Sequence, residues 1–343
     1  EEEEEEEEGV EGEDDFDSFG RAAAAAIPSD FVDPLGEEET ADADATLRNA
    51  EEMASVAAVR GVRGRVGVAL DQNERCRSYM EDRTVVHPDL LADGSITFAA
   101  SLDGHGGSEA VEMARRTLFL DVARELGERG GTDALRQPDW EKAQATAAAS
   151  LTAALETCDT RVCTSVKDKS GSTAALALLV RGEGDTPTRL FTANCGDARV
   201  VLVHADGTGQ RLTYDHKASD ADEQTRCKSM SPPAIFLWGR LQTTSAITRA
   251  IGDPDLKPYV IATPYTDAVQ LDSSHAAIVL ACDGIWDTMS DDDVARYIQD
   301  ALAEDGARDM AVLAASLIDT AIAKGSRDNM SAIVIPLAIE STA

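Results

Sequence analysis

The chain has 343 residues and a formal net charge of −33 at pH 7, which argues against nucleic acid and anionic membranes as partners. Its length fits one large domain or two small ones, and a hydrophobic share of 43% is enough for a sizeable core. The six cysteines are scattered without a CxxC pair, which argues against zinc and disulfide frameworks. We therefore expect a reducing compartment, the cytoplasm or the nucleus. No apolar stretch has membrane-spanning length and no signal peptide is visible, so no membrane span is expected.

The first 58 residues form a separate acidic segment. It begins with a run of glutamates and continues with Gly, Asp and a run of alanines. Such a segment buries too little apolar surface to offset the entropy cost of ordering it, so residues 1–58 are predicted to be a disordered tail. An alternative is a self-inhibitory tail whose carboxylates occupy a metal site elsewhere in the chain. Because the sequence starts without Met, we expect the natural N-terminus to lie further upstream.

Apolar periodicity predicts about ten strands in a folded domain over residues 59–340. Short apolar runs mark strands at 66–70, 84–86, 96–102, 174–180, 190–195, 200–203, 211–213, 276–282 and 330–337. Turn signals at 93–94, 196–197 and 206–209 predict that several of these strands are joined as hairpins. Helical spacing occurs at 110–118, 140–162, 291–301 and 308–323. Hairpins with helices segregated between them indicate an α+β fold in which helices cover a sandwich of sheets.

Residues 218–246 are less regular than the rest of the domain. They contain a polar helical stretch, then Pro232-Pro233, then the apolar run Ile235-Phe236-Leu237-Trp238. This composition predicts a surface subdomain, or flap, with an exposed apolar segment.

Three aspartates stand at the ends of three apolar runs. Asp103 follows the run at 96–102 and opens a turn with three glycines in four positions, Asp283 follows the run at 276–282, and Asp328 precedes the run at 330–337. The glycines let the backbone turn sharply and approach a ligand closely. A simpler interpretation is a tight strand-to-helix turn in which Asp103 caps the helix. The recurrence of the pattern favours convergence of the three carboxylates on one hard cation.

Carboxylates without histidine or thiolate partners select magnesium, manganese or calcium. Further acidic candidates are Glu81, Asp82, Asp168 and Asp287. A carboxylate that bridges two cations holds them about 3.5–4 Å apart, and a water between them becomes a nucleophile at neutral pH. Such a site suits the hydrolysis of a phosphate ester, with a guanidinium to hold the phosphoryl oxygens. Arg77, four residues before Glu81, is the candidate for that group; the alternative is an ordinary surface arginine.

Eight motifs then follow one another in a familiar order. They are RSYMED at 77–82, LDGHGG at 102–107, SGST at 170–173, ANCGDAR at 193–199, LTYDHK at 212–217, TRAIGD at 248–253, CDGIWD at 282–287 and RDNMS at 327–331. Through this series, from about Val66 to Ile335, the chain resembles the metal-dependent serine/threonine protein phosphatases of the type 2C family. One such motif carries no weight alone, but eight in the family's order leave little room for coincidence.

The resemblance implies a central antiparallel β-sandwich flanked by α-helices, with four layers in the order α-β-β-α. It also implies phosphoprotein substrates and two Mn²⁺ or Mg²⁺ ions at one end of the sandwich. By motif position, Asp103 would bridge both ions and Gly104 would offer its backbone carbonyl. Asp283 and Asp328 would hold the second ion, and Glu81 would act through bound water.

The resemblance also implies roles for the groups around the ions. Arg77 matches the phosphate-binding arginine, and His105 matches the proposed general acid, with mere bracing of the loop as the alternative for this histidine. Asp168 matches a ligand of a weaker third ion, with Asp287 as its companion. The implied reaction is direct hydrolysis of phosphoserine or phosphothreonine by a water that bridges the ions, and we expect a monomer.

Other motif positions are interpreted as structural. Asp197 is expected to be a turn residue, and Thr173, Asn194 and Arg199 are expected to pack and to form hydrogen bonds. The flap departs from the family pattern, because Ala218 stands at the usual proline, Ser231-Pro232-Pro233 in the Gly-Gly region and Gln242-Thr243 in place of Asn-Gly. Flap conformation and substrate choice are therefore left open.

Two other functions stay open on the sequence. One is a catalytically dead relative of these phosphatases that binds partners; such a protein should have lost Asp103, Asp283 or Asp328, and all three are present. The other is an acidic calcium-binding protein, which only the charge supports.

Overall fold

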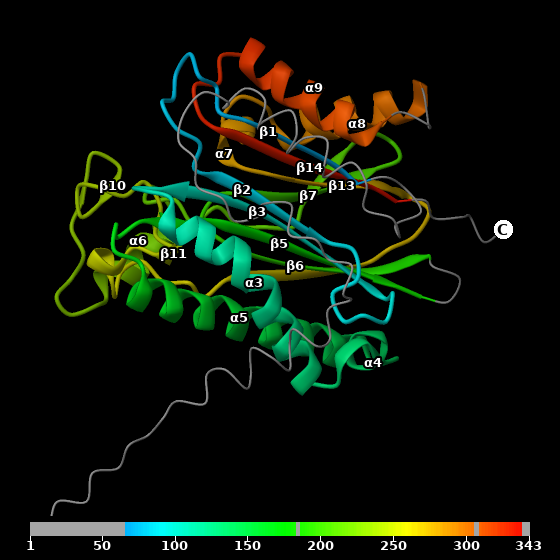
Figure 1. Ribbon diagram of the computed structural model, residues 1–343, viewed down its shortest axis with the longest axis horizontal. Helices are drawn as coiled ribbons and strands as arrows, with labels where there is room; N and C mark the ends of the chain where they lie inside the picture. The colour runs from blue at the N-terminus through cyan, green and yellow to red at the C-terminus, as the bar shows by residue number, and fades with distance from the viewer. Residues whose placement is uncertain (1–65, 183–185, 305–308, 338–343) are drawn as a thin grey trace, which may run out of the picture.

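The computed structural model describes residues 66–182, 186–304 and 309–337. Two antiparallel sheets lie face to face, and helices cover the outer side of each (Figure 1). This confirms the predicted α+β sandwich. The predicted tail at 1–58 lies outside the described residues. Among the described helices, none combines the length and the apolar character needed to cross a bilayer.

One sheet has five strands in the order β1-β14-β13-β7-β8. Their bounds are β1 Gly67–Asp71, β7 Arg199–His204, β8 Gly209–Arg211, β13 His275–Ala281 and β14 Met330–Pro336. The other sheet has the order β11-β4-β3-β5-β6-β12, and β2 also pairs with β3. Its strands are β2 Asp82–His87, β3 Ile96–His105, β4 Gly171–Ser172, β5 Ala174–Arg181, β6 Pro187–Cys195, β11 Ile251–Gly252 and β12 Tyr265–Gln270.

Three clusters of buried apolar side chains separate the four layers. One lies between the sheets, and each of the other two lies between a sheet and its helices. On β3, Ala99 belongs to the cluster between the sheets, whereas Phe98 and Ala100 belong to the cluster under the helices. Because both faces of the strand are buried, it reads as a continuous apolar run rather than an alternating one.

The helices form two outer layers (Figure 1). On one side these are α3 Glu109–Glu128, α4 Gly131–Arg136 and α5 Trp140–Ser165, and on the other side they are α8 Asp291–Glu304 and α9 Met310–Ala323. The predicted face of α3 is correct, since Ala110, Ala114 and Leu118 are all buried against the sheet. Helix α9 lies very close to β1, where a Cβ on Gly67 would come within 1.9 Å of the Met310 carbonyl oxygen.

The turn at 196–197 does not form the predicted hairpin. Strand β6 pairs with β5 and β12, whereas β7 pairs with β13 and β8 in the other sheet. Gly196, with a φ of 98°, therefore carries the chain from one sheet to the other. A turn signal predicts that the chain reverses but not which strand it pairs with next. The hairpins β2–β3 and β7–β8 do form as predicted.

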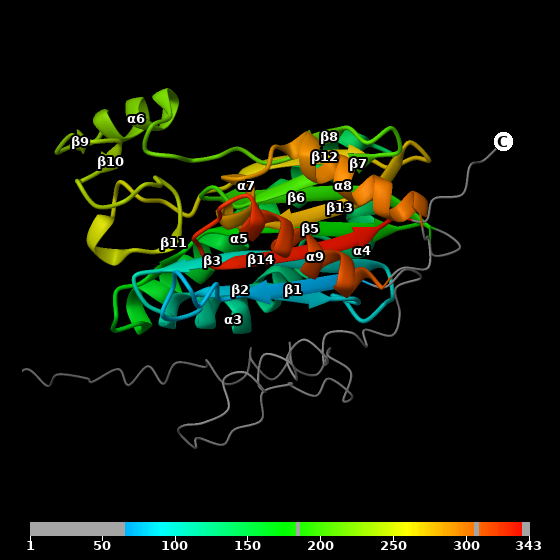
Figure 2. The same cartoon turned by 90° about the horizontal axis from the view of Figure 1, so that it is seen from above.

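The flap region projects beyond one end of the sheets (Figure 2). It contains α6 Ala221–Lys228, β9 Phe236–Leu237 and β10 Arg240–Leu241, and it has its own small cluster of buried side chains, among them Ala218, Cys227 and Leu241. Trp238, at the tip of the β9–β10 hairpin, is 86% exposed. The division of the chain into tail, domain and flap stays a prediction.

Candidate functional site

Three strand ends meet at one end of the sandwich. β13 and β14 are antiparallel neighbours with Ala281 opposite Ala332, so the residues that follow β13 and precede β14 share one edge. β3 lies against both strands from the facing sheet, and the hydroxyls of Ser101 and Ser331 lie 3.3 Å apart across the interface. The structure thereby brings together the predicted aspartates of three distant segments.

The turn after β3 lies further along the chain than the sequence predicts. The strand runs through His105, and the backbone enters positive φ at Gly106 (72°) and Gly107 (134°). Asp103 does not cap α3, whose N-cap position is Ser108. Gly104 is needed for close packing rather than for a turn, because a Cβ there would lie 2.6 Å from the Glu81 carbonyl oxygen.

Five aspartates form what we call the carboxylate cluster: Asp82, Asp103, Asp197, Asp283 and Asp328. Burial, followed by the charges of the other four, raises the pKa of Asp103 well above its usual value. Burial and neighbouring carboxylates likewise raise the pKa of Asp283 to about 8. Burial raises the pKa of Asp82 to about 6. The surrounding protein therefore supplies too little positive charge to stabilise the ionised forms of these carboxylates.

The donor set fits a hard divalent cation. Its atoms are carboxylate oxygens, which magnesium and manganese prefer, and Oδ2 of Asp82 is buried without a hydrogen-bond partner in the described part of the chain. Within residues 66–337, as far as they are described, no three His, Cys, Asp or Glu side chains are already arranged to ligate an ion. The carboxylate cluster therefore has the oxygen ligands that a divalent cation prefers, and nearby positive charge does not balance them. Its side chains are not yet arranged around a single point where an ion would bind.

Lys217 brings a positive charge to the part of the carboxylate cluster around Asp197. Its ammonium lies 3.3 Å from Asp197 and 3.2 Å from Asp287. Burial raises the pKa of Asp197, and Lys217 opposes that rise. The expectation that Asp197 is only a turn residue was too narrow, because its carboxylate also lies among those that act on Asp103. The ANCGDAR motif contains this aspartate, but spacing alone does not reveal where its carboxylate points.

Arg77 reaches the cluster from the loop before β2. Its Nη2 donates to Oδ2 of Asp328 at 2.5 Å, and its Nε donates to the Arg327 carbonyl at 3.3 Å. The side chains of Arg77 and Asp328 are 42% and 37% exposed. A guanidinium has five N–H donors, so donors remain for a ligand that arrives from solvent.

Asn329 ties the Arg77 loop to the cluster, a role that the sequence did not reveal. Its Nδ2 donates to the carbonyls of Gln72 and Tyr79, and its Oδ1 accepts from the backbone N–H of Glu81. Glu81 in turn accepts the N–H of Gly107 at 2.8 Å through Oε1. Glu81 therefore connects the loop before β2 with the turn after β3.

His105, the last residue of β3, pairs with a residue that motif analysis left without a role. Its Nε2 lies 2.8 Å and 3.0 Å from the two carboxylate oxygens of Asp253. Burial lowers the pKa of His105, but the hydrogen bond and charge of Asp253 outweigh it and leave the pKa raised. Asp253 closes the TRAIGD motif, so its presence was visible, but its contact with His105 was not.

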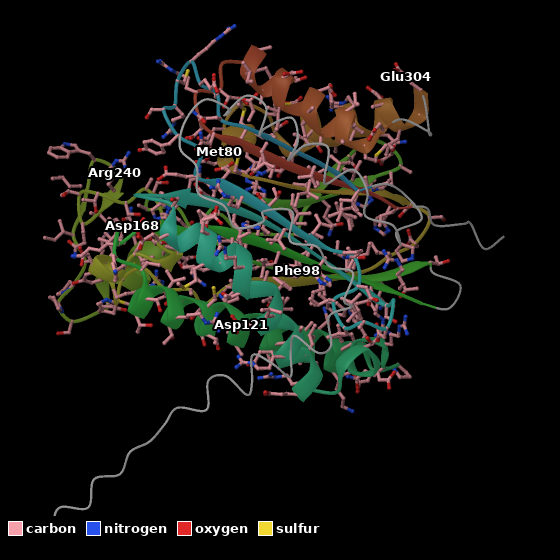
Figure 3. All side chains as sticks on the ribbon, in the orientation of Figure 1. Met80, Phe98, Asp121, Asp168, Arg240 and Glu304 are labelled. Carbon is pink, nitrogen blue, oxygen red and sulfur yellow. The ribbon has the colours of Figure 1, made fainter. Side chains whose placement is uncertain are left out.

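Asp168 and Asp287 lie outside the carboxylate cluster, and each contacts a different set of residues. Asp168 accepts from the Ser170 N–H and hydroxyl and from the Glu109 N–H at the start of α3. A Cβ on Gly107 would lie 2.3 Å from Asp168 Oδ2. Asp287 is 60% exposed and pairs with Lys217. In Figure 3, Asp168 and Met80, the residue before Glu81, lie toward the same end of the molecule as Arg240 of the flap.

The sequence of the described domain is similar to that of one family of known proteins. Residues 66–330 match the family model described as Protein phosphatase 2C. Protein phosphatase 2C homolog 1 of Schizosaccharomyces pombe is 32% identical over 275 residues, which cover 79% of this chain and 72% of that protein. Protein phosphatase 2C homolog 1 of Saccharomyces cerevisiae is 28% identical over 285 residues, which cover 79% of this chain and 92% of that protein.

The fold of this chain is also similar to the folds of solved protein structures. A C. elegans sex determining protein superposes with a TM-score of 0.67 at 27% identity, over 80% of this chain and 65% of that one. A serine-threonine phosphatase 2C from Toxoplasma gondii superposes with a TM-score of 0.64 at 21% identity, over 80% of this chain and 94% of that one. At that identity the second likeness concerns the fold alone.

Asp283→Asn should stabilise the metal-free protein, and the gain should grow with pH. The pKa of Asp283 is raised in the folded protein from 3.8 to about 8, so the wild type loses folding free energy as pH rises from about 4 to about 8. Asparagine does not titrate. The difference in unfolding free energy between variant and wild type, measured with urea in the presence of a chelator, should therefore be small near pH 4 and largest near pH 8.

Asp300→Asn is the matched control for this measurement, because Asp300 is exposed on α8. It should change stability little at any pH. A loss of stability in Asp283→Asn, or a gain that does not depend on pH, would contradict the repulsion within the cluster.

Proposed function

The chain belongs to the protein phosphatase 2C family and is a protein serine/threonine phosphatase, and we propose that its carboxylate cluster is the active site. The observation that carries this proposal is the convergence of Asp103, Asp283 and Asp328, from three distant segments, on one end of the sandwich. Phosphatases of this family are generally metal-dependent, and we propose Mn²⁺ or Mg²⁺ as the ions, because the donor set is made of carboxylate oxygens.

In this proposal the motif residues divide the work of holding two ions. Asp103 would hold both ions, Gly104 would add its carbonyl, and Asp283 and Asp328 would hold the second ion. Glu81 would act through bound water. Two bound divalent cations would supply a nucleophilic water at neutral pH and would offset charge on the phosphoryl group. The raised pKa values of Asp103 and Asp283 support these assignments, because positive charge is what these carboxylates lack.

A weaker third ion is proposed at Asp168, with Asp287 as its companion. Asp168 is exposed near the turn after β3, and its side chain already accepts three hydrogen bonds. Since Asp287 pairs with Lys217 instead, an ion at Asp168 would need water for most of its ligands. This fits weak binding.

Arg77 and His105 are proposed to act on the substrate. The free donors of Arg77 would bind the phosphate oxygens, and Nη2 already lies on Asp328 at 2.5 Å. His105 would protonate the serine or threonine alkoxide as it leaves. Alkoxides are strong bases and leave poorly without a proton, so a positioned acid has a clear purpose here.

The catalytically dead alternative has no observation in its favour, because every position proposed to hold an ion through a carboxylate keeps its acidic side chain. The calcium-binding alternative explains neither the eight ordered motifs nor the match to the phosphatase family. A monomeric state and a cytoplasmic or nuclear location stay predictions.

The test of the proposed function is phosphate release from a phosphothreonine peptide. We expect turnover with manganese, loss of turnover when a chelator is added, and recovery when manganese is restored. Asp283→Asn should nearly abolish turnover while its circular dichroism spectrum stays that of a folded protein. Turnover that survives the chelator, or full activity of Asp283→Asn at saturating manganese, would contradict the proposed site.

Arg77→Ala should mainly raise the KM for a phosphopeptide. The guanidinium meets the phosphate already in the ground state, so its loss removes binding more than transition-state stabilisation. Arg77→Lys should rescue KM only in part, because an ammonium cannot make the two-pronged contact. Arg327→Ala is the control, since Arg327 is exposed and meets Arg77 only through its backbone carbonyl. An unchanged KM in both Arg77 variants would remove Arg77 from the site.

His105→Gln should slow phosphothreonine peptide far more than p-nitrophenyl phosphate. General acid catalysis is typically worth roughly 10²- to 10⁴-fold, and a phenolate leaves with little help. A histidine that only braced the loop would disturb Asp103 and slow both substrates alike. The measurement is kcat for both substrates at saturating manganese, with His204→Gln, a histidine of β7 hydrogen-bonded to Gln210, as control. Equal proportional losses would exclude the general-acid role.

A further inference from the structure

Asp253 is a buried carboxylate that the proposed mechanism leaves unused. Its side chain is 9% exposed, whereas that of His105 is 37% exposed. Both of its oxygens lie within hydrogen-bond distance of one nitrogen, Nε2 of His105, at 2.8 Å and 3.0 Å. A carboxylate only accepts hydrogen bonds, so Nε2 carries a proton. In the described part of the chain, every hydrogen bond of this ring involves Nε2.

The backbone holds Asp253 in an unusual conformation. Its φ of 53° and ψ of 52° are left-handed, a region that residues other than glycine, asparagine and aspartate rarely adopt. Its N–H donates to the Ser170 carbonyl at 3.1 Å. The preceding residue, Gly252, donates its N–H at 2.7 Å to Asp159 of α5, which also accepts from Lys257. Helix α5 and the SGST loop therefore fix the place of this carboxylate.

Gly171 leaves room for the pair. A Cβ at this position would lie 2.4 Å from Oδ2 of Asp253 and 2.5 Å from Nε2 of His105. Any other residue would occupy the place of the hydrogen bond itself. Three segments of the chain, from β3, the SGST motif and the TRAIGD motif, thus meet at one hydrogen bond next to the carboxylate cluster.

We propose that Asp253 is a positioning residue for His105, which binds Nε2–H and so leaves Nδ1 as the nitrogen that hands its proton to the leaving group. The inference rests on the proposed general-acid role of His105. In that step the attacking water oxygen forms its bond to phosphorus, and the P–O bond to serine or threonine breaks with its electrons staying on the departing oxygen. That oxygen takes the proton from Nδ1, and the electrons of the N–H bond stay on the ring. The ring is left neutral with its proton on Nε2, which is the tautomer that Asp253 selects.

The competing explanation is a structural latch, in which the hydrogen bond only holds the loop after β11 against β3. A latch would affect the whole site, so its loss would slow every substrate alike. A positioning residue acts only through His105, so its loss would matter only where His105 matters. Two measurements therefore distinguish the latch from the positioning residue. One is whether the loss of kcat depends on the leaving group, and the other is whether the loss adds to that of a His105 variant.

Asp253→Asn is the decisive variant, because asparagine tolerates the left-handed backbone and keeps the shape of the side chain. At saturating manganese we expect kcat for phosphothreonine peptide to fall at least about tenfold, toward the value of His105→Gln, and kcat for p-nitrophenyl phosphate to fall far less. The double variant His105→Gln/Asp253→Asn should be no slower than His105→Gln alone. Asp255→Asn, whose exposed side chain pairs with Lys169, should behave like the wild type.

A second measurement does not depend on turnover. The protein is metal-free, its histidines are labelled with ¹⁵N, and the pH is high enough for the His105 ring to be neutral. The signal of His105, assigned among the five histidines by its absence in His105→Gln, should then show the proton on Nε2. Asp253→Asn should move it toward a mixture of tautomers. Gly171→Ala, which pushes a methyl group between the two side chains, should do the same without a change of charge.

Equal losses of Asp253→Asn on both substrates, losses that multiply with those of His105→Gln, or an unchanged tautomer would each overturn the inference. A wild type that releases phosphate from the peptide keeps the proposed function standing in any of these cases. Equal losses in His105→Gln itself would remove the general acid, and the role of Asp253 with it. A wild type without manganese-dependent phosphate release would instead remove the proposed function.

Discussion

Repulsion among buried carboxylates is the constraint on which the rest of this structure depends. At one end of the sandwich, burial and neighbouring carboxylates raise the pKa values of Asp82, Asp103, Asp197 and Asp283. Among the described residues, Lys217 and Arg77 form ion pairs with the carboxylate cluster, at Asp197 and Asp328. Such an arrangement costs folding free energy. The remainder of the domain must supply that free energy and must also prevent the loops from moving the charges apart.

The layered core meets both demands. Strands β3, β13 and β14 are buried on both faces by three apolar clusters, so the residues at their ends cannot shift without disturbing the sheets. The Ser101–Ser331 contact joins the two sheets just behind the cluster. Asn329 then fixes the Arg77 loop through three backbone groups. The charged side chains therefore lie at the ends of rigid strands, and hydrogen bonds fix the positions of the loops that connect these strands.

The sequence predicts this site best where chemistry and strand ends coincide. Asp103, Asp283 and Asp328 could be placed together because each adjoins a strongly apolar run. It predicts the fold less well where a strand lies at an edge: β12, with half-exposed residues from Tyr265 to Gln270, has no clear apolar pattern. The sequence also does not predict which strands pair with each other, because tertiary contacts decide the pairing. The turn at Gly196 is an example, since the strands on either side of it belong to different sheets. Asn329, Lys217 and Asp253 were visible in motifs, but their roles depend on which atoms they meet across the fold.

The balance of charge also explains why metal and substrate should depend on each other. A phosphate ester brings further negative charge to a cluster that already repels itself. Lys217 is held by Asp197 and Asp287, and Arg77 already gives a donor to Asp328, so little protein charge is free to attract the substrate. Cations bound at the carboxylates would reverse the sign of the site before phosphate arrives. By linkage, the substrate must then raise the affinity for the cations by the same factor. In this account the metal-dependence that we propose for the enzyme would follow from the charge of its own side chains.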